Sequence, residues 1–183
     1  MSISLQDKRT KRICLNAFLC ALAMMLSYLE AILPLYAIVP LPGFRLGLAN
    51  IVVVAAFFLL SPGEAALISF VRILLMGILF GSATSLYFSA MGGALSFLAL
   101  CLMGKLVKGC SFVGVSAVCA ASHNTGQIIA AVTLFGTERI RSYLPMLLLA
   151  SLVYGSAVGV ILNLSMPKFQ RVMQRAGIGG KVR

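Results

Sequence analysis

The sequence predicts an all-α polytopic membrane protein, built as a bundle of six transmembrane helices. The first observation is composition: of 183 residues, 61% are hydrophobic and 10% are charged, with a mean hydropathy of +1.04. A soluble domain of this size needs far more charge on its surface. The second is that the apolar residues gather in runs that approach the roughly 20 residues needed to cross a bilayer. The third is that basic residues lie at the ends of these runs, as in membrane proteins with a fixed topology.

The apolar runs divide the chain into six expected spans between two basic ends. In order, the runs cover residues 13–33, 46–60, 64–80, 86–104, 111–135 and 142–166. We therefore expect a membrane domain over 13–166, with basic cytoplasmic segments at 1–12 and 167–183. The second and third runs are short for a full crossing, so we expect them to be tilted little, broken, or packed inside the bundle.

Local signals between the runs support separate helices. The stretch Ser61–Glu64 reads Ser-Pro-Gly-Glu, which predicts a capping box with Ser as N-cap, Pro at the first helical position and Glu at the third. Gly109 followed by Ser111 likewise indicates the end of one helix and the start of the next.

The distribution of Lys and Arg predicts that both termini lie in the cytoplasm. Eleven of the 15 basic residues fall on the side of the termini, and Arg72 lies inside the third run. The opposite side holds three, namely Arg45, Arg139 and Arg141. Such a bias fixes orientation by the positive-inside rule.

The start of the chain also has the form of a signal peptide, with a basic stretch, an apolar run and small residues at Ala21–Ala23. The apolar run continues past that point to Leu33. We therefore expect a retained first helix.

Polar residues at membrane depth form the main candidate site. Arg72 lies about eight residues into the third run and His123 about twelve into the fifth, so about 12 and 18 Å deep at about 1.5 Å per residue. His123 and Gln127 share a helix face, and Asn124 is their neighbour. An arginine at this depth costs about 2.5–3.5 kcal/mol and normally faces a cavity, a partner or a ligand. The residues predict either a ligand site or a polar cluster that joins helices.

The segment between the first two runs cannot form a regular helix, because it holds Pro34, Pro40, Pro42 and Gly43. Its end places Arg45 and Asn50 at the outer mouth of the second helix. A lid over an outward-facing pocket and an ordinary loop both fit this pattern.

Small residues four apart let helix backbones approach closely in membranes. Such pairs occur at Ala17/Ala21, Gly77/Gly81, Ser89/Gly93 and Gly155/Gly159. We expect internal packing for most of them. Ala17 and Ala21 directly follow a basic stretch, so a surface that faces another subunit is the alternative there.

Several classes of function lack their signatures. No Gly-x-x-x-x-Gly-Lys-Ser/Thr motif is present to hold ATP, and one histidine without a Cys-x-x-Cys-His motif argues against haem. The four acidic residues are isolated in sequence and the five cysteines form no Cys-x-x-Cys pair. We therefore expect no enzyme activity, no metal site, no cofactor and no disulfide framework. Basic residues are not interleaved with aromatics, so we expect no nucleic-acid binding.

Three stretches carry a family resemblance: Arg-Leu-Gly-Leu-Ala-Asn-Ile at Arg45–Ile51, the helix around Arg72, and His-Asn-Thr-Gly-Gln at His123–Gln127. They resemble the Gx transporter family, also described as heptaprenyl diphosphate synthase component I. The resemblance extends over roughly residues 10–168. The architecture is similar to that of the substrate-binding S components of energy-coupling factor (ECF) transporters.

The resemblance implies a small-molecule binding protein of a bacterial cell membrane, with six helices in the lipid bilayer. Its ligand would be a vitamin or a cofactor or isoprenoid precursor. It implies partners as well: a transmembrane coupling (T) subunit, docked on Ala17 and Ala21, and two cytoplasmic ATPase subunits. The substrate-binding residues would be Arg45, Asn50, Arg72, His123, Asn124 and Gln127.

Two alternatives remain. One is a non-catalytic membrane accessory subunit of polyprenyl diphosphate or quinone synthesis. The other is a membrane component of a flavin or quinone redox chain. A catalytic synthase is disfavoured because prenyl diphosphate synthases use aspartate-rich motifs, and Asp7 is the sole aspartate here.

Overall fold

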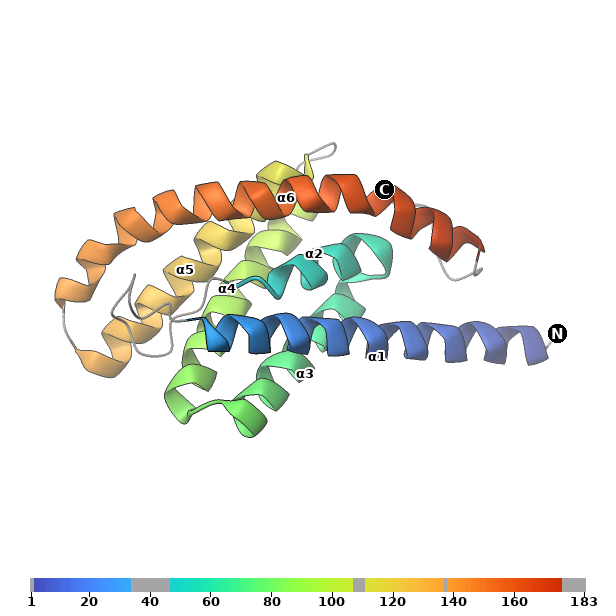
Figure 1. Cartoon of the computed structure of the whole chain (residues 1–183), viewed down its shortest axis with the longest axis horizontal. Coiled ribbons are helices and arrows are strands. Elements are labelled where there is room, and N and C mark those ends of the chain that lie inside the picture. Colours follow the sequence, from blue (N-terminus) through green and yellow to red (C-terminus); the bar gives the residue numbers. More distant parts are fainter. Residues whose placement is uncertain (1, 34–46, 107–110, 137, 176–183) are drawn as a thin grey trace.

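The structure is a computed structural model that describes residues 2–33, 47–106, 111–136 and 138–175, and all regular structure within them is helical (Figure 1). The helices are α1 (Ser2–Ile32), α2 (Asn50–Leu59), α3 (Pro62–Phe80), α4 (Ala83–Leu106), α5 (Phe112–Phe135), the 3-10 helix η2 (Glu138–Tyr143) and α6 (Leu144–Arg175). The predicted all-α bundle is confirmed, and each of the six apolar runs corresponds to one α-helix.

The first and last helices are longer than their apolar runs. The helix α1 has 31 residues and includes the basic stretch before residue 13, while α6 has 32 and continues through Pro167. At about 1.5 Å per residue each is about 46–48 Å long, whereas the hydrocarbon core of a bilayer is about 30 Å thick. The first described residues and the end of α6 lie at the same end of the molecule (Figure 1). Both helices therefore carry their basic ends beyond the apolar region on one side.

Four of the described helical segments are long and apolar enough to cross a membrane, and they comprise α1, α3, α4 and the η2–α6 segment. The helix α2 has ten residues, which is about half a crossing. The helix α5 has 24 residues, but its polar string His123–Gln127 lowers its hydropathy. Both lie inside: Val52–Ala56 of α2 are buried, and so is half of α5. Of the three alternatives predicted for the second run, packing inside the bundle is the one that the structure shows.

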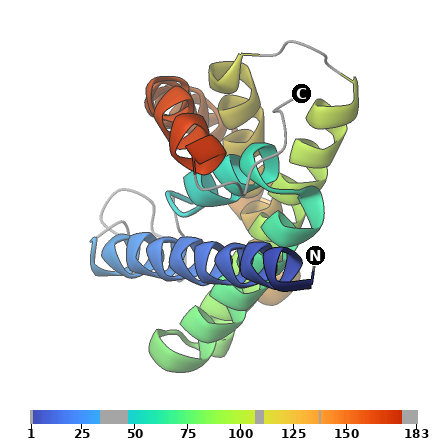
Figure 2. The same cartoon turned by 90° about the vertical axis from the view of Figure 1, so that its right-hand side faces the viewer.

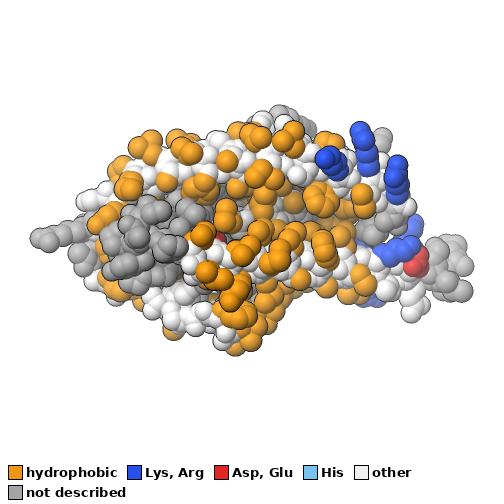
Figure 3. Space-filling model, viewed as in Figure 1, with side chains coloured by type: hydrophobic (Ala, Val, Ile, Leu, Met, Phe, Trp, Pro, Cys, Tyr) orange, Lys and Arg blue, Asp and Glu red, His pale blue; other side chains and the backbone are white. Residues whose placement is uncertain are grey.

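The outer surface is apolar in the middle and basic at one end. Figure 3 shows hydrophobic side chains along the body of the molecule and Lys and Arg side chains at the end where α1 begins and α6 ends. Large hydrophobic side chains are widely exposed, with Phe70 at 65% and Val153 at 75%. Surfaces of this kind are stable when lipid covers them.

The predicted N-cap, Ser61, begins α3 directly after α2, and the Glu64 carboxylate beside it also contacts α1. The hydroxyl of Ser61 accepts from the Glu64 N–H at 3.3 Å and donates to its carboxylate at 2.8 Å. The same carboxylate accepts from Arg12 at 2.6 Å and from Asn16 at 3.0 Å, both in α1. Ser111 caps α5 as predicted, accepting from the Val113 N–H at 3.1 Å; Gly109 lies outside the described residues.

Glycines bring the backbones of α4, α5 and α6 into contact. A Cβ built on Gly126 of α5 would lie 2.5 Å from a carbonyl oxygen of α4. On α6, a Cβ on Gly155 would lie 2.9 Å from the Cα of Ala117, and one on Gly159 only 2.3 Å from the Cα of Val113. The pair Gly155/Gly159 therefore packs inside the bundle, as expected. We call α4–α6 the glycine-packed half and α1–α3 the side-chain-packed half. In Figure 2, α1 lies beside the α3–α4 hairpin and on the opposite side from α6.

Candidate functional site

A chain of polar side chains connects three helices through the centre of the bundle. The guanidinium of Arg72 in α3 donates to Asn50 Oδ1 at the start of α2, at 3.4 Å. The Nδ2 of Asn50 lies 3.3 Å from Nδ1 of His123 in α5, and Nε2 of His123 lies 2.9 Å from the amide of Gln127. All but Asn50 are buried. The structure thus brings together four of the six residues predicted for the site.

The order of donors and acceptors in this chain follows from Arg72. Because a guanidinium only donates, Asn50 presents its oxygen to Arg72 and its NH₂ to Nδ1 of His123 and to Ser96 Oγ, at 3.3 and 3.1 Å. A neutral imidazole has one donor and one acceptor, so Nδ1 accepts and Nε2 carries the proton. The structure places the Gln127 amide nitrogen 2.9 Å from Nε2. A protonated Nε2 requires this amide to be turned by 180°, so that its carbonyl oxygen accepts the hydrogen bond.

The ring of His123 is held between two glycines. A Cβ on Gly92 of α4 would lie 2.7 Å from the ring carbon Cε1, and one on Gly47 would lie 3.0 Å from Cδ2. Gly47 also has φ +84°, a left-handed backbone that glycine adopts without strain. Any larger residue at either position would displace the imidazole.

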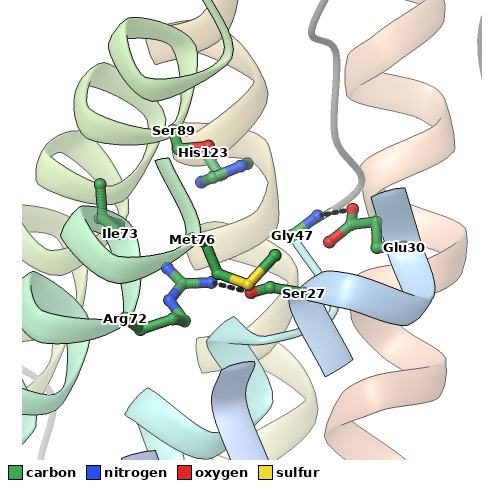
Figure 4. Close-up of a pocket in the computed structure, with 8 residues that line it drawn as sticks. All are labelled: Ser27, Glu30, Gly47, Arg72, Ile73, Met76, Ser89 and His123. Atoms are coloured by element: carbon green, nitrogen blue, oxygen red, sulfur yellow. Dashed lines mark hydrogen bonds between the residues drawn. The ribbon is translucent and has the colours of Figure 1, made fainter. Parts of the chain in front are cut away.

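A small polar cavity lies against this chain, and Figure 4 shows its walls. Its lining comes from α1, α3, α4, α5 and Gly47, and it encloses about 10 Å³, room for about one water molecule. Arg72 donates to Ser27 Oγ at 3.4 Å across it, and the Gly47 N–H donates to the Glu30 carboxylate. The cavity lies among residues predicted to bind a ligand, and at this volume it has no room for one.

Sequence reasoning missed four polar or backbone contributors to this cavity: Ser27, Glu30, Gly47 and Ser89. Glu30 was set aside as an isolated acid, yet it is 2% exposed and lines the same cavity as Arg72. Of the four acidic residues it is the one within the body of a predicted span, three residues before the end of the first run, whereas Glu64 is the first residue of the third run. Ionisable residues within membrane spans are rare and mark functional sites, so this signal was available.

The other predicted site residues lie elsewhere. Asn124 turns to α6, where its amide donates to the Leu147 carbonyl at 3.0 Å and to Ser151 Oγ at 3.2 Å. Arg45 lies outside the described residues. Ala17 and Ala21 are exposed on the outer face of α1, away from the cavity.

A second small space also has Gly47 in its wall. It encloses about 20 Å³ between α2, α5 and α6, and Asn50 lines it together with several apolar side chains. The Ser116 hydroxyl, which also lines it, is buried without a hydrogen-bond partner among the described residues. Gly47 therefore lines both small spaces, while Asn50 lines the second one.

Thiols and acids do not gather into a site within the described parts of the chain. Cys14, Cys20, Cys101 and Cys119 are free, and Cys110 lies outside the described residues. In the same parts there is no group of three or more His, Cys, Asp or Glu side chains placed to hold a metal ion.

Comparison with known proteins gives one match. The model of the family described as heptaprenyl diphosphate synthase component I matches residues 19–165. No curated protein and no solved structure matches the chain. The match covers most of the chain and carries the family description that the sequence stretches predicted, so the chain belongs to the heptaprenyl diphosphate synthase component I family.

Proposed function

We propose that this chain is the substrate-binding, S-like membrane component of an ECF-type importer for a vitamin or for a cofactor or isoprenoid precursor, and that it is not itself an enzyme. One observation carries the proposal: the buried chain from Arg72 through Asn50 and His123 to Gln127 lies against a polar cavity in the middle of an apolar bundle.

A role in joining helices does not by itself explain why Arg72 is buried in the bundle. In membranes such bonds contribute about 0.6 kcal/mol on average, while an arginine at the bilayer centre costs about 2.5–3.5 kcal/mol. The Ser89 hydroxyl in the cavity wall is buried without a hydrogen-bond partner among the described residues. An arginine and a buried hydroxyl that line the same space favour a polar or anionic ligand.

In the proposed binding site Arg72, Asn50, His123 and Gln127 contact the ligand or orient the groups that do. Arg45, predicted from the sequence to lie at the mouth of the site, is outside the described residues. Asn124 has a supporting role through α6. Because the cavity is closed in this structure, ligand entry requires α1 and the Gly47–Asn50 segment to separate from α4 and α5. Movement of Gly47, which lines both small spaces, would then join them into one site.

The proposed topology follows from the basic end of the molecule. Positive charge favours the cytoplasmic side, so the beginning of α1 and the end of α6 would lie in the cytoplasm of a bacterial cell, with six membrane crossings. Ala17 and Ala21 are exposed on α1 near this end. Small exposed residues four apart allow another helix to approach closely, so we assign this face to the T subunit, which in turn binds the two ATPases.

The family description favours a second candidate, a non-catalytic membrane subunit of a heptaprenyl diphosphate synthase. In that case the chain would associate with a soluble subunit that supplies the aspartates for magnesium and diphosphate. The same polar cavity would then hold a precursor or product.

Purification of the tagged chain from its own membrane, followed by mass spectrometry of the proteins that accompany it, tests the proposal. We expect a coupling subunit and ATPases, lost in Ala17→Leu and Ala21→Leu. Ala31→Leu is the matched control, because Ala31 is also exposed on α1 but at its other end. Recovery of a soluble prenyl synthase subunit in place of ATPases would overturn the transporter and support the synthase subunit.

A further inference from the structure

A large apolar groove opens on the outer surface between α3 and α4. It encloses about 390 Å³, far more than the two small spaces. Its walls include Phe70, Ile73 and Leu74 of α3 and Leu86, Ala90 and Phe97 of α4. A groove of this size on a membrane protein can accept an alkyl or isoprenoid chain.

The groove and the polar cavity share one wall, the side chain of Ile73. The Cδ1 of Ile73 presses against α4 at Gly93, where an added Cβ would lie 2.6 Å from it. In Figure 4, Ile73 lies on one side of the cavity and Glu30 on the other. The Ile73 side chain thus lines both an apolar groove and a cavity that is also lined by Arg72, Ser89 and His123.

We propose that the ligand is a single-chain anionic amphiphile, with its head group in the cavity at Arg72 and its chain in the α3–α4 groove. This inference rests on the proposed binding role of the cavity and specifies the ligand class. Ile73 is then the specificity-determining residue, because it must change rotamer for head and chain to be bound at once.

The charges favour an anionic head in the half of the cavity next to α3. Arg72 is 6% exposed, and its guanidinium forms strong paired hydrogen bonds with carboxylate or phosphate. Ser89 adds a buried hydroxyl, and His123 the edge of its ring. The Glu30 carboxylate lies across the cavity, where it accepts from the Gly47 N–H. A phosphate or carboxylate near Ile73 would therefore lie closer to Arg72 than to Glu30.

The groove by itself would accept any lipid chain, so the test must separate the chain from the head group. The sequence contains no tryptophan, and Phe70→Trp therefore places a single indole on the groove wall. Val153→Trp on the outer face of α6 is the matched control, because residue 153 is as exposed to lipid but distant from the groove in the fold. The full chain is placed in phosphatidylcholine nanodiscs and titrated with dodecyl phosphate brominated on the chain, which quenches nearby indoles.

We expect saturable quenching in Phe70→Trp and weak, non-saturable quenching in Val153→Trp. Adding Arg72→Gln should raise the half-saturating concentration about tenfold or more, the effect of one lost charge-assisted hydrogen bond. Adding Ile73→Phe should weaken quenching by a similar factor, because the ring blocks the passage. Far-UV circular dichroism and size-exclusion chromatography confirm that each variant is folded.

Two controls identify the source of binding. Brominated dodecanol, which has the chain without the charge, should quench both indoles alike, and inorganic phosphate should displace the amphiphile only at far higher concentration. Equal quenching with and without Arg72→Gln would overturn the inference, because the groove would then be an ordinary lipid contact. Inorganic phosphate that competes as well as the amphiphile binds would overturn the role of the chain. Neither result changes the outcome of the partner purification, so the proposed function is tested independently of the ligand class.

Discussion

The two halves of the bundle are held together in different ways. In the glycine-packed half, α4, α5 and α6 meet backbone to backbone at Gly126, Gly155 and Gly159. In the side-chain-packed half, α1, α2 and α3 contact one another through longer side chains, and Arg72 of α3 donates to Ser27 of α1 and Asn50 of α2 at 3.4 Å. Close glycine contacts leave no room for adjustment, whereas side chains can change rotamer.

The three spaces described above lie along the boundary between these halves. The polar cavity lies between α1 and α3 on one side and α4 and α5 on the other, the second small space between α2 and α5–α6, and the groove between α3 and α4. The comparison therefore indicates a rigid half that supplies His123 and a second half that can separate from it to admit a ligand. The residues that we propose to bind the ligand lie where the two kinds of packing meet.

The largest expected effect comes from disturbing the glycine-packed half. Gly159→Ala places a methyl group 2.3 Å from the Cα of Val113, and such overpacking costs about 1–3 kcal/mol. Gly114→Ala in α5 has nothing within 4 Å of the new Cβ and should be neutral or stabilising by up to about 1 kcal/mol. Thermal unfolding in detergent measures both. Equal melting temperatures for Gly159→Ala and Gly114→Ala would show that the close contact between α5 and α6 tolerates an added methyl group.

The next effect is on binding. Arg72→Gln and His123→Ala should each weaken the ligand by about tenfold, roughly 1.4 kcal/mol, while the protein stays folded. The matched control is Ser151→Ala, which removes a polar group that Asn124 contacts between α5 and α6 and should leave affinity unchanged. Equilibrium binding to the ligand recovered from native membranes is the measurement. Variants at Arg72 and His123 that bind as the wild type does would remove these residues from the site.

A smaller effect is expected where α1 is tied to the α2–α3 turn. Ser61→Ala removes the N-cap of α3 and should lower stability by about 1 kcal/mol. Glu64→Gln breaks the ion pair with Arg12, which is partly exposed, and should lower stability by less than about 1 kcal/mol. Both effects are read from the unfolding midpoint in detergent. A larger loss for Glu64→Gln than for Ser61→Ala would mean that the ion pair, and not the cap, holds this turn.

The smallest expected effect is a change in the tautomer of His123, with no change in the free energy of unfolding. Because the chain has one histidine, selective ¹⁵N labelling gives signals from His123 alone. We expect Nε2 protonated and Nδ1 unprotonated, the tautomer that Arg72 sets through Asn50. Asn50→Ala should let the two tautomers mix. A protonated Nδ1 in the unaltered protein would reverse the assigned direction of the hydrogen bonds.

Most of the fold was predictable from the sequence because lipid imposes simple requirements. Apolar runs bounded by Ser61 and Ser111 located the helices within a few residues. The ends of α1 and α6 were not predictable in this way, since helix formation continues into polar sequence beyond the bilayer and hydropathy carries no signal for it. The continuation of α6 through Pro167 was not predictable either, because proline usually ends or kinks a helix.

The site was predictable in its residue types but only partly in its contacts. Arg72, His123 and Gln127 stood out because polar groups in apolar runs are rare. Glu30 and Ser27 were not placed with them, because only the packing of α1 against α3 brings these residues to the cavity. Asn124 was assigned to the site with its neighbours, yet successive residues on a helix point in different directions, and its amide faces α6.

Native mass spectrometry of the full chain, released from its own membrane, tests the central claim most directly. We predict one bound small molecule per chain in the wild type, retained in Ala17→Leu and lost in Arg72→Gln. That pattern would place the ligand at the boundary between the two halves and the partner contact on the outer face of α1. A bound mass that persists in Arg72→Gln, or is absent from the wild type, would contradict the account.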